Sequence, residues 1–172
     1  MILKTERLTL RPFTMGDLKT THAYASDPEN TRFMIHLPNK TKRQTRRFLK
    51  YTIAKGKKRP QRCYEFTVIL DGKHIGAVSV NLDKSGQEGE LGWIIQRAYW
   101  GNGYATEAAG AIMTFAREEL QVKKLVAHCD HRNSASARVM EKLGMALESD
   151  SGTRRYKGSE EDVRELKYAV SL

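Results

Sequence analysis

Residues 100–108 read WGNGYATEA, a glycine-rich turn that leads directly into an alanine-rich stretch with helical spacing. The residues before it, ELGWIIQ (90–96), are typical of a strand. The first amides of a helix have no partner in the chain, and the helix dipole adds positive potential at that end. Glycines let the backbone come close to phosphate oxygens. The stretch therefore predicts an anion site, most simply one for phosphate.

Two better-known phosphate loops do not fit this stretch. A Walker loop needs Gly-Lys-Ser/Thr, whereas Gly103 is followed by Tyr104 and Ala105. A dinucleotide fingerprint needs a third glycine, but Thr106 stands at that position. It also needs an acidic residue at the end of a second strand about 20 residues on, and the sequence has none there. Both loops are therefore excluded.

Hydrophobic periodicity elsewhere predicts an α/β (α+β) chain. Strands are expected at 5–11, 64–70, 75–82, 90–96, 124–130, 145–150 and 163–170. Helices are expected at 14–27, over a short stretch around 48–53, and at 105–120 and 133–144. Thr14 and Asp17 form a capping-box-like start, and Asn133 and Gly144 bound the last helix. This order indicates one mostly antiparallel mixed sheet of about seven strands with about four helices.

Length and composition favour a single domain spanning residues 1–172. Apolar residues make up 40% and charged residues 29% of the chain, as in globular proteins. No apolar run approaches the roughly 18 residues of a membrane helix, and the amino terminus does not resemble a signal peptide. Two cysteines, Cys63 and Cys129, do not make a disulfide framework. We expect a cytoplasmic monomer or homodimer without membrane contact.

The net charge of +10 is concentrated in one part of the chain. Between Asn30 and Tyr64 there are twelve Lys or Arg residues and no acidic residue, and we call residues 40–62 the basic segment. It could bind nucleic-acid phosphates, attract an acidic acceptor, or be a solvated helix face. Phe48 and Tyr51 are its only aromatic residues, fewer than single-strand binders use for base stacking.

Three motifs in order carry a family resemblance. The stretches ELGWIIQ, WGNGYATEA and NSASARVMEKLGM (133–145) resemble the GNAT superfamily of acyl-CoA-dependent N-acetyltransferases. With the opening TERLTLRPFTMGDL (5–18), they resemble its Rim-type branch, which includes ribosomal-protein N-terminal acetyltransferases. In the superfamily pattern Gln/Arg-x-x-Gly-x-Gly/Ala, Gly103 and Ala105 match, and Trp100 takes the first position as is common in the Rim-type branch. The resemblance implies a GNAT-like domain whose central strands splay apart to form an acyl-CoA cleft.

The resemblance also implies where acetyl-CoA binds. The exposed backbone of Ile94 and Ile95 is expected to pair with the pantetheine arm, and the Ile94 amide to polarise the thioester carbonyl. Asn133 is expected to bond the pantetheine amide region, and Ser136 to lie near the thiol. In the alternative interpretation, Asn133 is only a helix N-cap and Ser136 only a surface serine. The pyrophosphate is expected on the amides of Gly101, Asn102, Gly103, Tyr104, Ala105 and Thr106.

Acetyl transfer to an amine requires that the ammonium first lose a proton. Glu90 is the leading candidate for the catalytic base, directly or through water, and Glu88 is the nearest substitute. Glu90 could also be a solvated residue at a strand entry. Many family members supply a tyrosine to protonate the departing thiolate, but Met140 stands at that position. We therefore assign this catalytic role to Ser136 or to solvent.

The cluster HCDH (128–131) is not expected to bind a metal. Adjacent strand residues point to opposite faces, and no second Cys/His pair stands at a zinc spacing. Cys129 is also a poor candidate for a covalent relay, because strand alternation could bury it.

Together these features predict an acetyl-CoA-dependent N-acetyltransferase that acts by direct attack of the amine on the thioester in a ternary complex. The expected acceptor is a protein or peptide N-terminus, or a small amine such as an amino sugar, a polyamine or an amino acid. The net positive charge argues against a polyamine. The basic segment could dock the enzyme on a ribosomal protein or the ribosome surface. The alternative is a nucleic-acid- or ribosome-binding module with a vestigial CoA fold.

Overall fold

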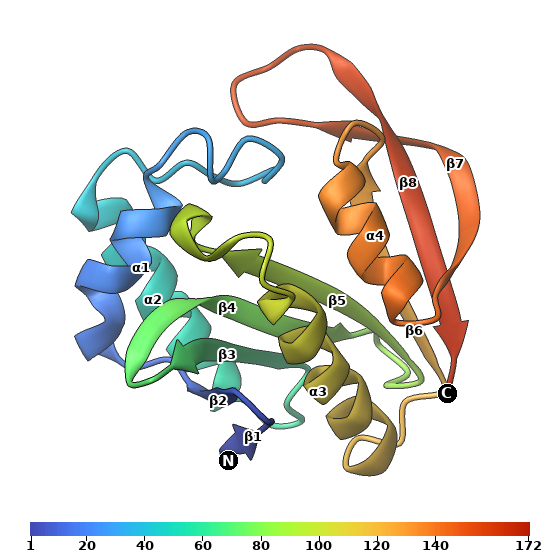
Figure 1. Ribbon diagram of the computed structural model, residues 1–172, viewed down its shortest axis with the longest axis horizontal. Coiled ribbons are helices and arrows are strands. Elements are labelled where there is room, and N and C mark those ends of the chain that lie inside the picture. Colours follow the sequence, from blue (N-terminus) through green and yellow to red (C-terminus); the bar gives the residue numbers. More distant parts are fainter.

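The structure, a computed structural model, describes residues 1–172 as one eight-stranded sheet with four α-helices (Figure 1). In chain order the elements are β1 (Leu3–Lys4), β2 (Leu8–Pro12), η1 (Met15–Asp17), α1 (Leu18–Ala25), α2 (Lys42–Gly56), β3 (Cys63–Leu70), β4 (Lys73–Leu82), β5 (Glu88–Ile95), η2 (Arg97–Tyr99), α3 (Tyr104–Glu118), β6 (Lys124–Asp130), α4 (Ser134–Lys142), β7 (Ala146–Arg155) and β8 (Asp162–Ser171).

The sheet has the strand order β1-β2-β3-β4-β5-β6-β8-β7, and β5–β6 is its one parallel pair. The mostly antiparallel α/β fold expected from the sequence is confirmed. The expected first strand at 5–11 is wrong in its first residues, because the Thr5 amide and hydroxyl both bond the Leu8 carbonyl in a tight turn. This turn separates the two-residue strand β1 from β2. The helix expected around 48–53 is observed as α2, which is longer than predicted and spans Lys42–Gly56.

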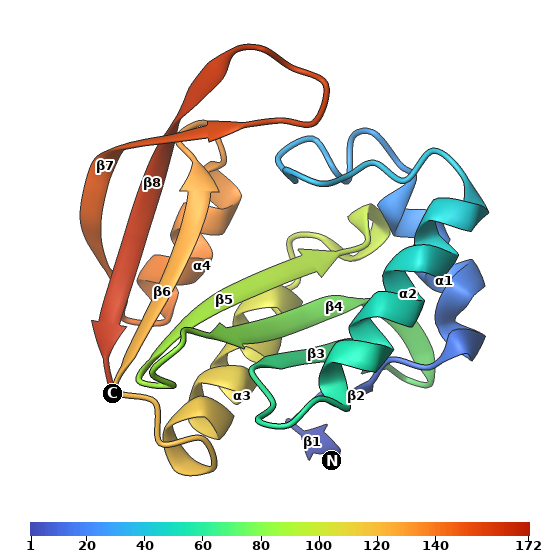
Figure 2. The same cartoon turned by 180° about the vertical axis from the view of Figure 1, so that it is seen from behind.

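The helices cover both faces of the sheet. α2 and α3 lie on opposite faces, as the front and rear views show (Figures 1 and 2). On α3 the buried positions are those with helical spacing, and Ala108, Ala109 and Ala116 let the helix lie close to the strands. Ile112 is fully buried in the same core, worth about 2 kcal/mol in hydrophobic stabilisation. The opening turn is thus anchored by a helix that is packed into the core.

The two central strands splay apart as expected. The β5–β6 ladder has three pairs, from Glu88↔Lys124 to Glu90↔Val126, and then ends. Beyond Glu90, β5 stays paired with β4 as far as Ile95, while β6 follows β8 (Figure 2). Gly89 lies in the closed part, where an added Cβ would come within 2.8 Å of the Val80 side chain. One edge of β5 is therefore left open in the middle of the sheet.

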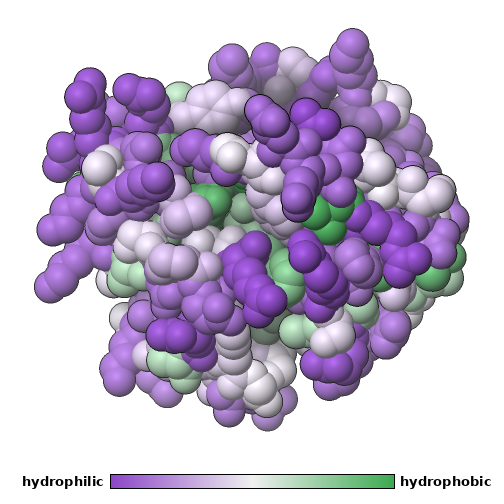
Figure 3. Space-filling view, turned by 90° about the horizontal axis from the view of Figure 1, so that it is seen from above, coloured by the Kyte–Doolittle hydropathy of each residue, from purple (hydrophilic) through white to green (hydrophobic).

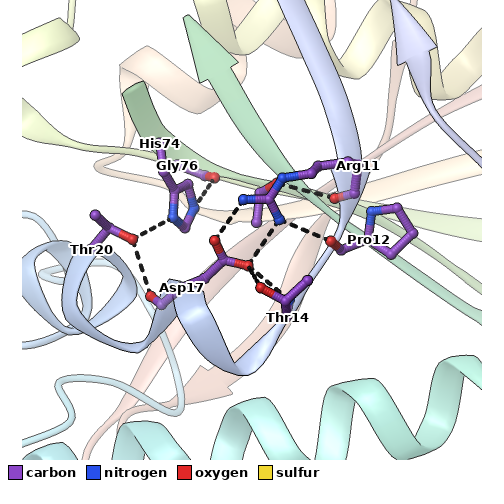
Figure 4. Close-up of polar contacts among 8 residues, drawn as sticks. Arg11, Pro12, Thr14, Asp17, Thr20, His74 and Gly76 are labelled. Carbon is purple, nitrogen blue, oxygen red and sulfur yellow. Dashed lines mark hydrogen bonds and ion pairs between the residues drawn. The ribbon is translucent and has the colours of Figure 1, made fainter. Parts of the chain in front are cut away.

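A polar network ties α1 to the sheet (Figure 4). Arg11 donates to both carboxylate oxygens of Asp17, at 2.9 and 2.7 Å, and the Thr14 amide donates at 2.7 Å. This confirms the expected capping box of Thr14 and Asp17. Burial alone would raise the pKa of Asp17, but the hydrogen bonds from Arg11 and Thr14 outweigh it and lower the pKa to about 2. His74 extends the network by hydrogen bonds to Thr20 and to the Gly76 carbonyl.

We predict that Asp17→Asn lowers the free energy of unfolding by about 3 kcal/mol, because it leaves the Arg11 guanidinium without its buried partner. The folded-state pKa of Asp17 lies below its unfolded value of 3.8, so its contribution is present above pH 3.8 and lost as the pH falls toward 2. Urea unfolding at pH 7 and near pH 2 measures both effects. Asp162→Asn, which removes an ion pair with both partners exposed, is the matched control and should cost less than about 1 kcal/mol. Equal losses in the two variants would contradict this prediction.

Candidate functional site

A groove of about 470 Å³ lies where the open edge of β5 faces the starts of α3 and α4. We call it the donor groove. Its lining includes nine of the residues predicted from the sequence: Ile94, Ile95, Gly101, Gly103, Tyr104, Ala105, Thr106, Asn133 and Ser136. Asn102 is absent from the lining because its side-chain amide instead donates to the carbonyls of Tyr99 and Trp100. Arg138 and Lys142 of α4 also line the groove and bring positive charge to it.

The turn before α3 presents a run of free backbone donors to this groove. None of the amides from Gly101 to Thr106 donates to a protein acceptor. Gly101 and Gly103 have φ of 77° and 80°, a region that favours glycine and that turns successive N–H groups toward one side. Gly103 is also the N-cap of α3 and offers no side chain to its first turn. These donors, together with the helix dipole, make an anion site.

Arg7 holds the turn from outside the groove, a role that the sequence alone did not indicate. Its guanidinium donates to Glu107 at 2.7 Å and to the Asn102 carbonyl at 3.1 Å. It also lies over the ring of Tyr104, with its Cζ atom 4.7 Å from the ring centroid. The acidic residue Glu107 in the first turn of α3 suggests a cationic partner. The sequence does not identify Arg7 as that partner, because the two residues are 100 positions apart.

The register of β5 corrects the expectation for Ile94. The Gln96 amide donates to Ile75 of β4, and Ile94 stands opposite Ala77, so the Ile94 N–H and C=O face β4. Backbone groups of successive strand residues point to opposite edges, so those of Trp93 and Ile95 point away from β4. They face the edge of β5 that is no longer paired with β6. The expected exposed backbone at Ile95 agrees with this register, while the exposed backbone expected at Ile94 belongs to Trp93.

Trp100 closes the far end of the open edge. Its indole Nε1–H donates to the Ile95 carbonyl at 2.7 Å. Trp100, which takes the Gln/Arg position of the superfamily pattern, thus connects the end of β5 to the turn by this hydrogen bond. The backbone groups that remain available along the open edge include the N–H and C=O of Trp93 and the N–H of Ile95.

A second cavity of about 860 Å³, the acceptor cavity, lies on the α1–α2 side of β5. Both cavities are lined by Phe33, Met34, Trp93, Ile94, Asn133 and Ser136, so they meet in one continuous cleft. From above, hydrophobic surface is visible between the hydrophilic side chains that surround a hollow in this face of the molecule (Figure 3). Two substrates could therefore approach each other from opposite sides of β5.

Glu90 lies in the acceptor cavity and is paired with His128, a residue of the HCDH cluster. The parallel register sets Val126 beside Glu90, and two residues further on His128 Nδ1 lies 2.9 Å from Glu90 Oε1. The hydrogen bond from His128 lowers the pKa of Glu90, and the same bond raises the pKa of His128. Glu88 lines neither cavity and lies 3.7 Å from Lys124 instead.

Asn133 and Ser136 are bonded to each other at the start of α4. Asn133 Oδ1 accepts from the Ser136 amide at 3.2 Å, and Asn133 Nδ2 donates to Ser136 Oγ at 3.0 Å. The N-cap role of Asn133 is therefore confirmed. Because Ser136 Oγ accepts this bond, its own hydrogen is free for another partner. Met140 is fully buried and lines neither cavity.

The buried carboxylate of Asp130 joins the start of α4 to the end of β7. It accepts from Arg132 at 2.7 Å and from the Tyr156 hydroxyl at 2.6 Å. Burial would raise the pKa of Asp130, but these hydrogen bonds outweigh it and hold the pKa well below its usual range. The cluster fixes the wall of the cleft that carries Ser136.

The basic segment contains α2, whose capping box is formed by Thr41 and Gln44. Its buried face carries Thr45, Leu49 and Thr52, and most of its cationic side chains are exposed to solvent. Arg47 is the cation of α2 that lines the acceptor cavity. The segment is thus mainly a solvated helix face with one cation at the cleft.

No three His, Cys, Asp or Glu side chains gather in a way that could hold a metal ion. Cys129 is buried and burial raises its pKa to about 11, which disfavours the reactive thiolate. None of the helices has the length and apolar composition that a membrane crossing needs.

Comparison with known proteins supports the resemblance seen in the sequence. Residues 7–146 match the family model described as acetyltransferase (GNAT) domain. The chain is 30% identical over 152 residues to the uncharacterized N-acetyltransferase YnaD of Bacillus subtilis, covering 86% of this chain and 84% of YnaD.

Solved structures give the same result. A GNAT-family acetyltransferase from Bacillus anthracis is 30% identical and superposes with a TM-score of 0.86, over 99% of this chain and 98% of that chain. RimL, a ribosomal L7/L12 alpha-N-protein acetyltransferase in complex with coenzyme A, shares the fold with a TM-score of 0.87 at 17% identity, over 100% and 98% of the two chains. The cleft, the free amides of the turn and these matches agree: the chain belongs to the GNAT acetyltransferase family and is an acyltransferase.

Proposed function

We propose that residues 1–172 form one catalytic unit that transfers the acetyl group of acetyl-CoA to a primary amine, and that the acceptor is the α-amino group of a protein or peptide N-terminus. One observation carries this proposal. The donor groove and the acceptor cavity meet beside Trp93, between the free amides of the turn and the Glu90–His128 pair.

The residues of the donor groove fit acetyl-CoA. Six consecutive free amides and the α3 dipole suit a pyrophosphate, and the open edge of β5 suits the amide groups of a pantetheine arm. Arg138 and Lys142 add positive charge for further phosphate groups. When bound, acetyl-CoA supplies the activated thioester. In place of the Ile94 amide, we assign the Trp93 N–H as the donor to its carbonyl oxygen.

The acceptor side supplies proton transfer. Glu90 takes the proton of the ammonium, directly or through water, and His128 holds the carboxylate in place. Ser136, whose hydroxyl hydrogen is free, donates to the departing thiolate. An α-amine with a pKa of about 8 is easier to deprotonate than a lysine side chain at about 10.4, which favours N-terminal acceptors. A small amine would use the same groups.

The exposed cations of the basic segment support docking to a ribosomal protein or to the ribosome surface. Arg47 at the cavity edge and the solvated cations of α2 form a positive rim that attracts an acidic partner. A nucleic-acid-binding module with a vestigial fold is not favoured, because the chain belongs to an enzyme family and keeps an open cleft.

We predict that Gly103→Ala weakens coenzyme A binding about tenfold or more, because alanine resists the φ of 80° and the turn then misaligns its amides. Gly72→Ala is the matched control, since Gly72 has a φ of 74° in the β3–β4 turn with no atom near its Cβ position. Each variant should lose about 1 kcal/mol of stability. Calorimetric titration with coenzyme A should separate them. Unchanged affinity in the Gly103 variant would place the pyrophosphate elsewhere.

We predict that Glu90→Gln lowers kcat about 100-fold at neutral pH, because general base catalysis is removed. The loss should shrink as the pH approaches the pKa of the acceptor, since a deprotonated amine needs no base. Thiol release from acetyl-CoA, followed from pH 6.5 to 10 with N-terminal peptides, measures this. Affinity for coenzyme A should stay unchanged. If Glu88→Gln shows the larger loss, the base is assigned to the wrong carboxylate, and silence of the wild type with all amines would refute the transferase proposal.

A further inference from the structure

The acceptor cavity contains a second carboxylate that the proposed chemistry does not use. Glu65 on β3 lines the cavity and stands opposite Ser79 of β4, which in turn stands opposite Gly92 of β5. Glu65 is therefore on the cavity face of the sheet, two strands away from the reaction end. Adjacent strands lie about 4.8 Å apart, so the Cα atoms of Glu65 and Gly92 are separated by about 10 Å.

Glu65 takes part in no ion pair, and its one polar contact is a weak hydrogen bond from the Cys63 thiol at 3.9 Å. Burial raises the pKa of Glu65, and the opposing effect of the Lys55 charge is smaller. A carboxylate that is largely removed from water costs free energy unless a cation or several hydrogen-bond donors accompany it. Glu65 therefore lacks a partner that a ligand could supply.

The acidic and the basic side chains of the acceptor cavity lie on different parts of its lining. The part of its lining that comes from β3, β4 and β5 carries Glu65 and Glu90 and no Lys or Arg. The Lys and Arg residues of the cavity are Arg47, Arg154 and Lys157, from α2 and from the end of β7 and beyond, and His128 of β6 is paired with Glu90. Arg154 already faces Glu165, with 2.9 Å between Nε and Oε2. The floor is thus acidic although the whole chain carries a charge of +10.

The floor between Glu65 and Gly92 carries only the small side chain of Ser79. Gly92 has no side chain there, and a Cβ at this position would come within 3.0 Å of Ser79 Oγ. Glu90 lies two residues from Gly92 along β5, so the Cα atoms of Glu65 and Glu90 are about 12 Å apart, and both residues line the cavity. A ligand group held by Glu65 would accordingly lie a few bonds from an amine held at Glu90.

We propose that Glu65 binds a second cationic group of the acceptor, an ammonium or a guanidinium, so that the preferred substrate carries two positive charges a few bonds apart. This inference rests on the proposed function. The shared chemistry could come from a short diamine or from a peptide with Lys or Arg close to its N-terminus. The acidic floor outweighs the positive charge of the chain for such a substrate.

The test compares substrates that differ only in the second charge. One pair is 1,4-diaminobutane and butylamine, and the other is an N-terminal Ala-Lys peptide and its Ala-norleucine analogue. We expect the wild type to prefer one or both charged members about tenfold or more in kcat/KM. Whichever pair shows the preference identifies the source of the charge. Glu65→Gln should abolish the preference through KM, and Glu65→Asp should restore part of it.

Glu118→Gln, an exposed carboxylate at the end of α3, is the matched control and should keep the preference. Coenzyme A titration and thermal unfolding verify that the Glu65 variants are folded. A wild type that acetylates amines without regard to the second charge, or a Glu65→Gln variant that retains the preference, would overturn this inference alone. Failure of the wild type to acetylate any amine would overturn the proposed function as well.

Discussion

The rest of the site depends on the early end of the β5–β6 ladder. Three parallel pairs hold the strands together, and beyond Glu90 the backbone of β5 keeps one edge without a partner in the sheet. Unpaired backbone groups inside a sheet need water or a ligand to satisfy them, and the open edge therefore suits an extended polar ligand. On one side of this edge lie the amides of the turn, and on the other lies the Glu90–His128 pair.

Polar anchors keep this opening in shape, since hydrophobic packing cannot fill it. Arg7 fixes the turn through Glu107, and Asp130 fixes the start of α4 through Arg132 and Tyr156. Each anchor lies on one side of the divergence and fixes the segments of its own half of the sheet. The same opening exposes the floor of the acceptor cavity, where Glu65 takes part in no ion pair. Substrate selection can thus depend on local charges that oppose the charge of the whole chain.

Features encoded by neighbouring residues were predictable from the sequence. The glycine turn, the helix that follows it and the N-cap of Asn133 each depend on a few consecutive residues, and their order indicated the family. The contacts of Arg7 and His128 were not predictable, because their partners Glu107 and Glu90 lie 100 and 38 residues away. The direction of the Ile94 amide was predicted wrongly, because alternation gives the side-chain faces but not which neighbouring strand accepts the N–H. The register against β4 decides that point.

The most direct test of the account is the response of individual backbone amides to coenzyme A. Titration of ¹⁵N-labelled protein should shift the amide signals of Gly101 to Thr106, Trp93 and Ile95 most strongly. The Ile94 amide, bonded to β4, should shift less than both of its neighbours. Large shifts confined to other parts of the sheet, or a larger shift at Ile94 than at Trp93 and Ile95, would contradict the central claim that the open edge of β5 and the turn together bind the donor.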